Sequence, residues 1–175
     1  MQHSDRDCIT KAHIFPLGEC CTAVLSYKEV FGYPLLIEES LMDVNKLKAS
    51  FAESNPYTNG LGIEVTHIEQ DFAKGQIAFV KHIQNRSGFV HGGAYMSLAD
   101  TIASAAVHSL GASYVTQSCS FQFYKATKDE TLYCTARVNH RGRKTCVAET
   151  KLTHADGTLA GEGLFSFYKV SDQEV

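Results

Sequence analysis

A single carboxylate lies in an apolar run of the sequence. Asp100 is the only acidic residue between Ala94 and Ser109, and this run contains no Lys or Arg to pair with it. The run has the composition of a helix that is buried nearly all round. Burying an unpaired carboxylate costs on the order of several kcal/mol, so Asp100 faces solvent, makes a structural hydrogen bond or takes part in chemistry. A desolvated carboxylate in a cleft is typical of general acid/base or nucleophilic catalysis.

Two glycines come directly before this run. Gly92 and Gly93 fall where the first unpaired N–H groups of the predicted helix must lie, and glycine lets a ligand approach the backbone closely. A helix N-terminus offers oriented donors and a partial positive charge to an oxygen that becomes negative. Oxyanion donors followed by a carboxylate two turns along the same helix predict a site for acyl transfer.

These residues belong to a longer pattern. Asn85 is followed six residues later by His91-Gly92-Gly93 and then by Leu98-Ala99-Asp100. This pattern resembles the hotdog-fold acyl-CoA thioesterases of the phenylacetate-degradation (PaaI) type, within the broader 4-hydroxybenzoyl-CoA thioesterase superfamily. The resemblance covers about residues 61–170. It implies an α+β hotdog fold, with an antiparallel β-sheet wrapped around a long central helix, and hydrolysis of an acyl-CoA to free acid and CoA.

The resemblance also implies roles for the residues at the helix start and for the carboxylate. Asp100 attacks the thioester or activates the water that does, and the sequence leaves these two roles open. The N–H of Gly92 polarises the thioester carbonyl, with Gly93 assisting. His91 orders the loop or contacts the thioester; a purely structural histidine is the alternative.

Two further polar residues are candidates by resemblance. Asn85 holds the water or the loop through its amide, or it only makes the turn with residues 86–88. Thr116 matches a hydroxyl position that binds the water in some relatives, while Gln117 and Ser118 are adjacent alternatives. Strand alternation is expected to put Thr116 and Ser118 on one face and Gln117 on the other.

Basic residues suit the phosphates of coenzyme A. Arg141, Arg143 and Lys144 fall in a turn where relatives contact the nucleotide, although a solvated hairpin tip explains the same pattern. Four aromatic residues near the pattern either shape the acyl pocket or belong to the core: Phe89, Tyr95, Phe121 and Phe123.

The hydrophobic pattern predicts the elements that position these residues. We expect a helix that Asp43 caps and that ends near Asn55, a central helix over 94–109, and strands at 61–69, 75–83, 113–124, 132–140, 144–153 and 159–170. The first two strands are expected to be separated by a turn at 70–74. Residues 1–42 are interpreted as an N-terminal extension of unknown role and residues 43–175 as the hotdog thioesterase domain.

Composition excludes some functions and favours others. The chain of 175 residues is 44% hydrophobic, with net charge −3 and pI near 6.2, so it has no basic footprint for nucleic acid. No run reaches the roughly 18 apolar residues that cross a membrane, and the polar first residues do not resemble a signal peptide. We therefore expect a cytoplasmic protein, and its six cysteines to be reduced thiols without metal-ligand spacing.

The resemblance further implies a homodimer or a homotetramer made of two dimers, with active sites at the subunit interface. It implies no metal and no cofactor, because coenzyme A is part of the substrate and water is the second reactant. Two alternatives remain open at this stage. One is a hotdog enoyl-thioester hydratase or dehydratase that uses His91 with Asp100, and the other is a non-enzymatic acyl-CoA-binding module.

Overall fold

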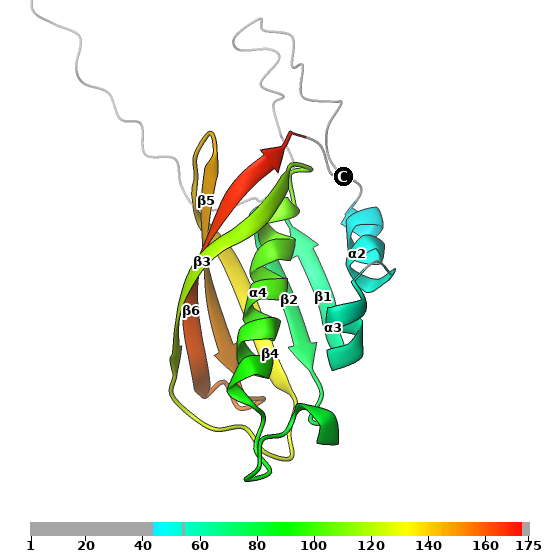
Figure 1. The fold of residues 1–175 in the computed structure, drawn as a ribbon, viewed down its shortest axis with the longest axis vertical. Helices are drawn as coiled ribbons and strands as arrows, with labels where there is room; N and C mark the ends of the chain where they lie inside the picture. The colour runs from blue at the N-terminus through cyan, green and yellow to red at the C-terminus, as the bar shows by residue number, and fades with distance from the viewer. Residues whose placement is uncertain (1–43, 54, 173–175) are drawn as a thin grey trace, which may run out of the picture. The chain divides into compact units, whose positions relative to one another are not determined.

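The computed structural model describes residues 44–53 and 55–172, and the predicted extension at 1–42 lies outside them. The described elements in chain order are α2 (Val44–Glu53), α3 (Pro56–Leu61), β1 (Ile63–Glu69), β2 (Phe72–Ile77), the 3₁₀ turn η1 (Lys81–Ile83), α4 (Gly92–His108), β3 (Ser113–Phe123), β4 (Leu132–Arg141), β5 (Thr145–Thr153) and β6 (Leu159–Ser171) (Figure 1). Their order and types confirm the predicted α+β class.

One antiparallel sheet carries all six described strands, in the order β1-β2-β4-β5-β6-β3. The long helix α4 packs against every one of these strands, as Figure 1 shows. This is the predicted arrangement of a sheet wrapped around a central helix. The helices α2 and α3 lie beside β1, and β3 runs along the opposite side of α4.

Small side chains let α4 approach the sheet closely. Alanines such as Ala99, Ala103 and Ala106 are fully buried on the helix. At Gly75 of β2, an added Cβ atom would lie 2.1 Å from Cδ1 of Ile102, so no larger residue fits there without a shift. One stripe of α4 stays open, however, and carries the half-buried Ser97, Asp100 and Ser104. The helix is therefore not buried all round, and its carboxylate lies on the open stripe.

The predicted turn at 70–74 is wrong, because β2 already begins at Phe72. Glu69 pairs with Phe72 across a tight turn in which Asp71 adopts a left-handed φ of 59°. Contacts distant in sequence fix this turn: the N–H of Asp71 donates to Ser109 Oγ at 2.9 Å, and Arg141 binds its carboxylate. The predicted strand at 75–83 accordingly ends at Ile77.

Within the described ranges, no helix is long and apolar enough to cross a membrane, and no group of His, Cys, Asp and Glu side chains could hold a metal ion. The cytoplasmic location stays a prediction. Of the cysteines that the structure describes, Cys119 is exposed, Cys134 and Cys146 are buried, and all three are free thiols.

Candidate active site

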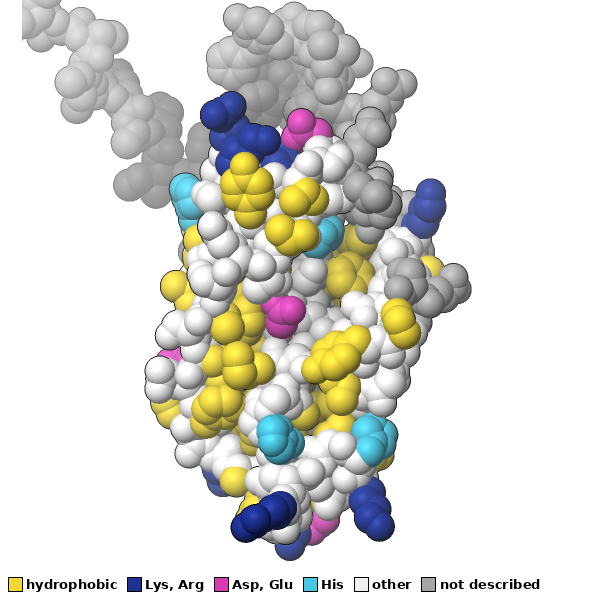
Figure 2. Space-filling view, viewed as in Figure 1, with side chains coloured by type: hydrophobic (Ala, Val, Ile, Leu, Met, Phe, Trp, Pro, Cys, Tyr) yellow, Lys and Arg dark blue, Asp and Glu magenta, His cyan; other side chains and the backbone are white. Residues whose placement is uncertain are grey.

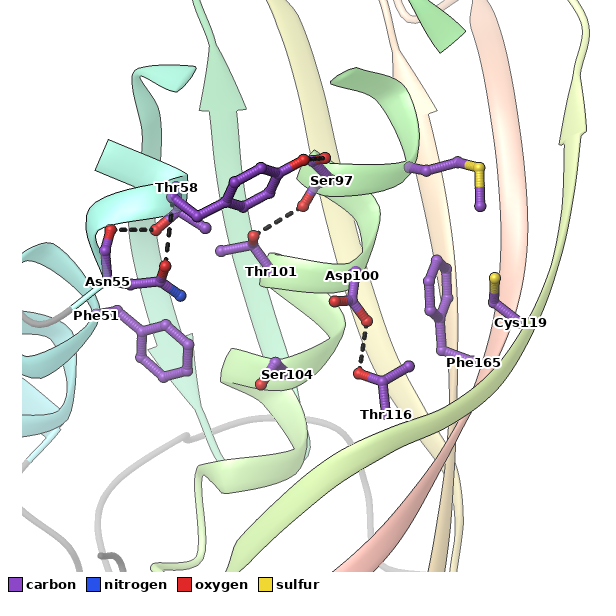
Figure 3. A pocket seen from close by; sticks show the side chains of 12 residues that line it. Phe51, Asn55, Thr58, Ser97, Asp100, Thr101, Ser104, Thr116, Cys119 and Phe165 are labelled. Atoms are coloured by element: carbon purple, nitrogen blue, oxygen red, sulfur yellow. Dashed lines mark hydrogen bonds between the residues drawn. The ribbon is translucent and has the colours of Figure 1, made fainter. Parts of the chain in front are cut away.

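The open stripe of α4 meets β3 at a hydrogen bond between Asp100 and Thr116. The Thr116 hydroxyl donates to Oδ1 of Asp100 at 2.8 Å, and in Figure 3 the two side chains point toward each other. The strand is brought to this place by His108 at the end of α4, whose Nε2 accepts a 3.1 Å hydrogen bond from the N–H of Tyr114. One oxygen of Asp100 is thus fixed, and the carboxylate can act as a base or a nucleophile.

Burial raises the pKa of Asp100, and the hydrogen bond from Thr116 lowers it again in part. The two effects have opposite signs because burial disfavours the charged carboxylate, whereas a donor stabilises it. A carboxylate with these surroundings binds a proton more readily than an exposed aspartate does. This is the property that general base catalysis requires.

A β-bulge decides which residues of β3 face Asp100. Thr116 pairs with Phe167 and Ser118 with Ser166, so the register shifts at Gln117. The expected alternation is therefore wrong here, because the extra residue moves Ser118 off the face that carries Thr116. Cys119, which pairs with the buried Phe165, takes that place instead.

Asp100 and Thr116 lie in a pocket of about 380 Å³ between α3, α4 and β3. Its lining residues are Phe51, Asn55, Tyr57, Thr58, Met96, Ser97, Asp100, Thr101, Ser104, Thr116, Cys119 and Phe165. Among these described residues, Asp100 is the only acid. Figure 2 shows hydrophobic side chains grouped over this face, with an acidic side chain between them.

The pocket is bridged on the α3 side by a tyrosine. The hydroxyl of Tyr57 lies 2.8 Å from Oγ of Ser97, which is one helical turn before Asp100. Ser97 in turn donates to the carbonyl of Gly93 at 2.9 Å. The ring of Tyr57 is 65% exposed, so it forms a wall of the pocket and not part of the core.

The N-terminus of α4 is capped by His91. Its Nδ1 accepts a 2.9 Å hydrogen bond from the N–H of Gly93, so this nitrogen carries no proton. Among the described residues the N–H of Gly92 has no hydrogen-bond partner, and it remains available to a ligand. The N–H of Gly93 is occupied in this conformation, and assistance from Gly93 stays a prediction.

Asn85 shapes the loop that leads to this helix end. Its Oδ1 accepts hydrogen bonds from the N–H groups of Ser87 at 2.9 Å and Phe89 at 3.2 Å, and its own N–H donates to the carbonyl of Phe89 at 2.7 Å. This is the turn-forming alternative for Asn85, and a further role in holding water stays a prediction. Phe89 is half-buried beneath the ammonium group of Lys128.

The two halves of the predicted site are separated within one chain. Gly92 and Asp100 are eight residues apart on α4, which places their backbones about 12 Å apart along the helix axis. Asn85, Phe89, His91 and Gly92 do not line the pocket that holds Asp100 and Thr116. One chain therefore cannot present the Gly92 N–H and its own Asp100 to the same carbonyl group.

Arg141 has a different role from the predicted one. Its guanidinium donates to Asp71 Oδ1 from Nη2 at 2.6 Å and from Nε at 3.1 Å, to the Tyr114 hydroxyl at 3.0 Å and to the carbonyl of Val107 at 3.0 Å. This half-buried group joins the end of α4 to two strands, and four of its five N–H donors are committed to the fold. Arg143 and Lys144 are exposed and remain candidates for phosphate binding.

The aromatic candidates divide between core and surface. Tyr95 is buried, whereas Phe123 is 53% exposed although it packs on Tyr95 and on Phe121. Phe123 also lies beside Gly92, where an added Cβ atom would be 3.5 Å from its ring. An exposed aromatic side chain therefore lies next to the free N–H at the start of α4.

Sequence reasoning missed several residues of the pocket wall. Ser97 and Ser104 are three residues before and four residues after Asp100, and this helical spacing could have placed them on the same face. No comparable sequence signal marks Phe51 or Tyr57. They come to the pocket through the packing of α2 and α3, which local sequence does not determine.

Comparison with known proteins places the chain in a family. The family model of the thioesterase superfamily matches residues 87–160. The acyl-coenzyme A thioesterase PaaI of Escherichia coli K12 is 29% identical over 103 residues, which are 58% of this chain and 74% of that protein. The solved structure of PaaI has a TM-score of 0.70 at 25% identity, over 75% of this chain and 97% of that one.

Two other relatives agree with this placement. A putative esterase of Mycobacterium tuberculosis H37Rv is 30% identical over 95 residues, which are 51% of this chain and 68% of that protein. A hypothetical thioesterase from Streptococcus pneumoniae TIGR4, solved with coenzyme A, has a TM-score of 0.62 at 27% identity, over 64% of this chain and 91% of that one. Two mutant structures of that protein carry alanine for an aspartate and for a threonine sixteen residues later. This chain belongs to the thioesterase superfamily and is a hotdog-fold thioesterase of the PaaI type.

Proposed function

We propose that this protein hydrolyses acyl-CoA thioesters and that the pair of Asp100 and Thr116 performs the chemistry. The observation that carries the proposal is the 2.8 Å hydrogen bond between these side chains in a pocket with no other acid among its described residues. The two residues are sixteen positions apart, as are the aspartate and threonine replaced in the S. pneumoniae thioesterase. The name of the E. coli relative and the coenzyme A bound to the S. pneumoniae protein support an acyl-CoA as substrate.

A second copy of the chain completes the site in this proposal. The 12 Å separation along α4 keeps Gly92 away from Asp100 of its own chain, so the loop at 85–93 of another subunit must face the carboxylate. The protein would then be a homodimer, or a tetramer made of two such dimers, with two equivalent sites in each dimer.

The reaction follows from the groups brought together. The N–H of Gly92 donates to the thioester carbonyl oxygen as negative charge develops on it. Ionised Asp100 either removes a proton from the attacking water or attacks the carbonyl carbon itself, and water then cleaves the resulting anhydride. In both cases the C–S bond breaks and a proton goes to the departing thiolate, which gives the free acid and CoA.

The pocket beside Asp100 is where we place the acyl group. Apolar side chains of Phe51, Met96 and Phe165 line it, and the hydroxyl of Tyr57 is hydrogen-bonded to that of Ser97. A compact acyl group suits a pocket of about 380 Å³. Arg143 and Lys144 are our candidates for the phosphates of the nucleotide.

Thiol release from phenylacetyl, hydroxybenzoyl, short-chain, medium-chain and long-chain acyl-CoAs tests the proposal. Asp100→Asn keeps the shape but removes the anion, so turnover of the best substrate should fall by about a hundredfold or more. Asp129→Asn makes the same charge change in an exposed loop and should leave turnover unchanged. Unchanged turnover in Asp100→Asn would move the chemistry elsewhere.

The same substrate panel separates the alternatives. Acyl-CoA binding without hydrolysis of any thioester would favour the binding module. Addition of water to an enoyl-CoA, without thiol release, would favour the hydratase. In the structure the acceptor role of His91 Nδ1 is already taken by the N–H of Gly93, which does not favour His91 as the base of a hydratase.

A further inference from the structure

Four polar side chains form a relay of contacts beneath the N-terminus of α4, and three of them, Tyr95, Thr127 and His154, are buried. The Tyr95 hydroxyl is 2.5 Å from Oγ1 of Thr127, and Oγ1 of Thr127 is 2.9 Å from Nε2 of His154. Nδ1 of His154 lies 3.4 Å from Oε1 of Glu130. The order threonine, histidine, glutamate is that of a hydrolase triad, but Thr127 is 0% exposed and no substrate can reach its hydroxyl. A different role is required.

The proton positions in this relay of side chains can be assigned one by one. The Tyr95 hydroxyl donates its only proton to the carbonyl of Lys125 at 2.9 Å, so toward Thr127 it can only accept. Thr127 must then donate to Tyr95, and toward His154 it can only accept. Nε2 of His154 therefore carries a proton. Burial raises the pKa of Tyr95, which keeps its hydroxyl protonated.

The other ring nitrogen of His154 faces a carboxylate. A bare Nδ1 would direct its lone pair at the Glu130 oxygen, whereas a protonated Nδ1 forms an ion pair with it. Asp156 is the other acid near His154, and its pKa is lowered mainly by the hydrogen bond from the Thr158 N–H and further by Lys125 and His154. The Glu130 carboxylate therefore faces Nδ1 of the ring whose Nε2 bonds Thr127, and it orients that ring.

The relay of side chains holds the backbone on both sides of Gly92. The carbonyl of Thr127 accepts a 2.9 Å hydrogen bond from the N–H of Val90, two residues before Gly92. The hydroxyl of the same threonine contacts Tyr95, three residues after Gly92. Thr127 therefore fixes both flanks of the free N–H.

We propose that Glu130, His154 and Thr127 act as positioning residues that hold the Gly92 N–H through Tyr95. The link to turnover rests on the proposed function, because it assigns the thioester carbonyl to Gly92. The relay of these four side chains does not itself depend on that assignment.

Glu130→Gln tests the relay with little risk to folding, since this side chain is 38% exposed. Without the anion the His154 ring loses the group that orients it, so kcat should fall about tenfold while KM changes less than about twofold. Asp129→Asn is the matched control, because it removes a neighbouring charge without touching His154.

Tyr95→Phe removes the hydroxyl that contacts Thr127 at the end of the relay. Its kcat should also fall. Adding Glu130→Gln to Tyr95→Phe should cause no further loss of kcat, because both residues act through the same relay of side chains. A purely structural role would lower Tm in both variants and leave kcat unchanged at temperatures where the protein is folded. A folded Glu130→Gln enzyme with the kcat of the wild type would overturn the proposal.

Nitrogen-15 NMR of labelled histidine gives a readout without substrate. Nε2 of His154 should show the shift of protonated nitrogen, with the signal assigned by its loss in His154→Gln. A bare Nε2 in the wild type would overturn the relay even if the enzyme is active. Conversely, a protonated Nε2 in a protein that hydrolyses no thioester would overturn the proposed function alone.

Discussion

Oγ1 of Thr116 lies 2.8 Å from Oδ1 of Asp100, on a strand whose alternation is broken by a bulge one residue later. The hydrogen bond joins β3 to the open stripe of α4. It fixes the orientation of the carboxylate and offsets part of the rise in its pKa that burial causes. Orientation and ionisation of Asp100 thus depend on one hydroxyl group.

Thr116→Val removes this hydroxyl and nearly keeps the shape of the side chain. We expect the pKa of Asp100 to rise further, so the acidic limb of the kcat/KM profile should move to higher pH. Turnover on the plateau should fall about tenfold, the scale of one lost charge-assisted hydrogen bond. Thr116→Ser restores the hydroxyl and should restore the wild-type profile. An unchanged acidic limb in Thr116→Val would show that this hydrogen bond does not control ionisation.

Asp100→Asn should stabilise the fold while it abolishes turnover. The pKa of Asp100 is raised in the folded state, so the stabilisation from its protonated form is complete below the ordinary pKa of aspartate and is lost as pH rises through the folded value. At pH 7 the ionised carboxylate is therefore a cost to folding. Asparagine removes this cost, and we expect the free energy of unfolding at pH 7 to increase by about 0.5–2 kcal/mol.

Urea denaturation of wild type and Asp100→Asn at pH 7 and at pH 3.5 measures this difference. The gain should shrink at the lower pH, where Asp100 is protonated in the wild type. Asp156→Asn provides a control of opposite sign, because the pKa of Asp156 is lowered by the hydrogen bond from Thr158. Its replacement should not stabilise the protein. Destabilisation by Asp100→Asn at pH 7 would contradict the argument.

The sequence predicted α2, α4 and the six strands in their order and most of their bounds, because hydrophobic periodicity and turn residues are local signals, but it did not predict α3 or η1. It failed where tertiary contacts decide the backbone. The turn at Asp71 is tight because Ser109 and Arg141 bind it, and both lie far away in sequence. The same guanidinium was predicted to bind phosphate, since sequence shows that a charge is present but not that its donors are already used.

The residues of the site also fall into those that the sequence identifies and those that only tertiary contacts place. Asp100 was identifiable because a lone carboxylate in an apolar run is rare, and Thr116 followed from family resemblance. The bulge at Gln117, which puts Cys119 and not Ser118 on the face of Thr116, depends on pairing with β6. Tyr57 lies in a short helix without apolar periodicity, so only the folded chain places it beside Ser97.

Tyr57 is expected to limit the size of the acyl group. Tyr57→Ala removes the ring that forms one wall of the pocket, so the ratio of kcat/KM for long-chain over short-chain acyl-CoA should increase about tenfold. Tyr57→Phe keeps the ring but loses the contact with Ser97, and it should change this ratio by less than about threefold. Equal ratios in wild type and Tyr57→Ala would place the acyl group outside this pocket.

Gly92→Pro tests the oxyanion donor and the second subunit together. Gly92 is the first residue of α4, where proline is well accepted, and His91 has the extended conformation (φ −66°, ψ 141°) that a residue before proline prefers. The substitution therefore removes the N–H with little change in the backbone, and kcat should fall about 10²–10³-fold. Gly92→Ala keeps the N–H and should retain most activity, since the added Cβ makes ordinary contact with Phe123.

The same Gly92→Pro variant tests whether each site joins Asp100 of one chain to Gly92 of another. Unfolded Gly92→Pro and Asp100→Asn chains, mixed and refolded together, should then recover about a quarter of wild-type activity. Half of the dimers are mixed, and each mixed dimer has one intact site of two. A site contained in one chain would recover none, so activity of the refolded mixture equal to that of the separately refolded variants would overturn the shared site.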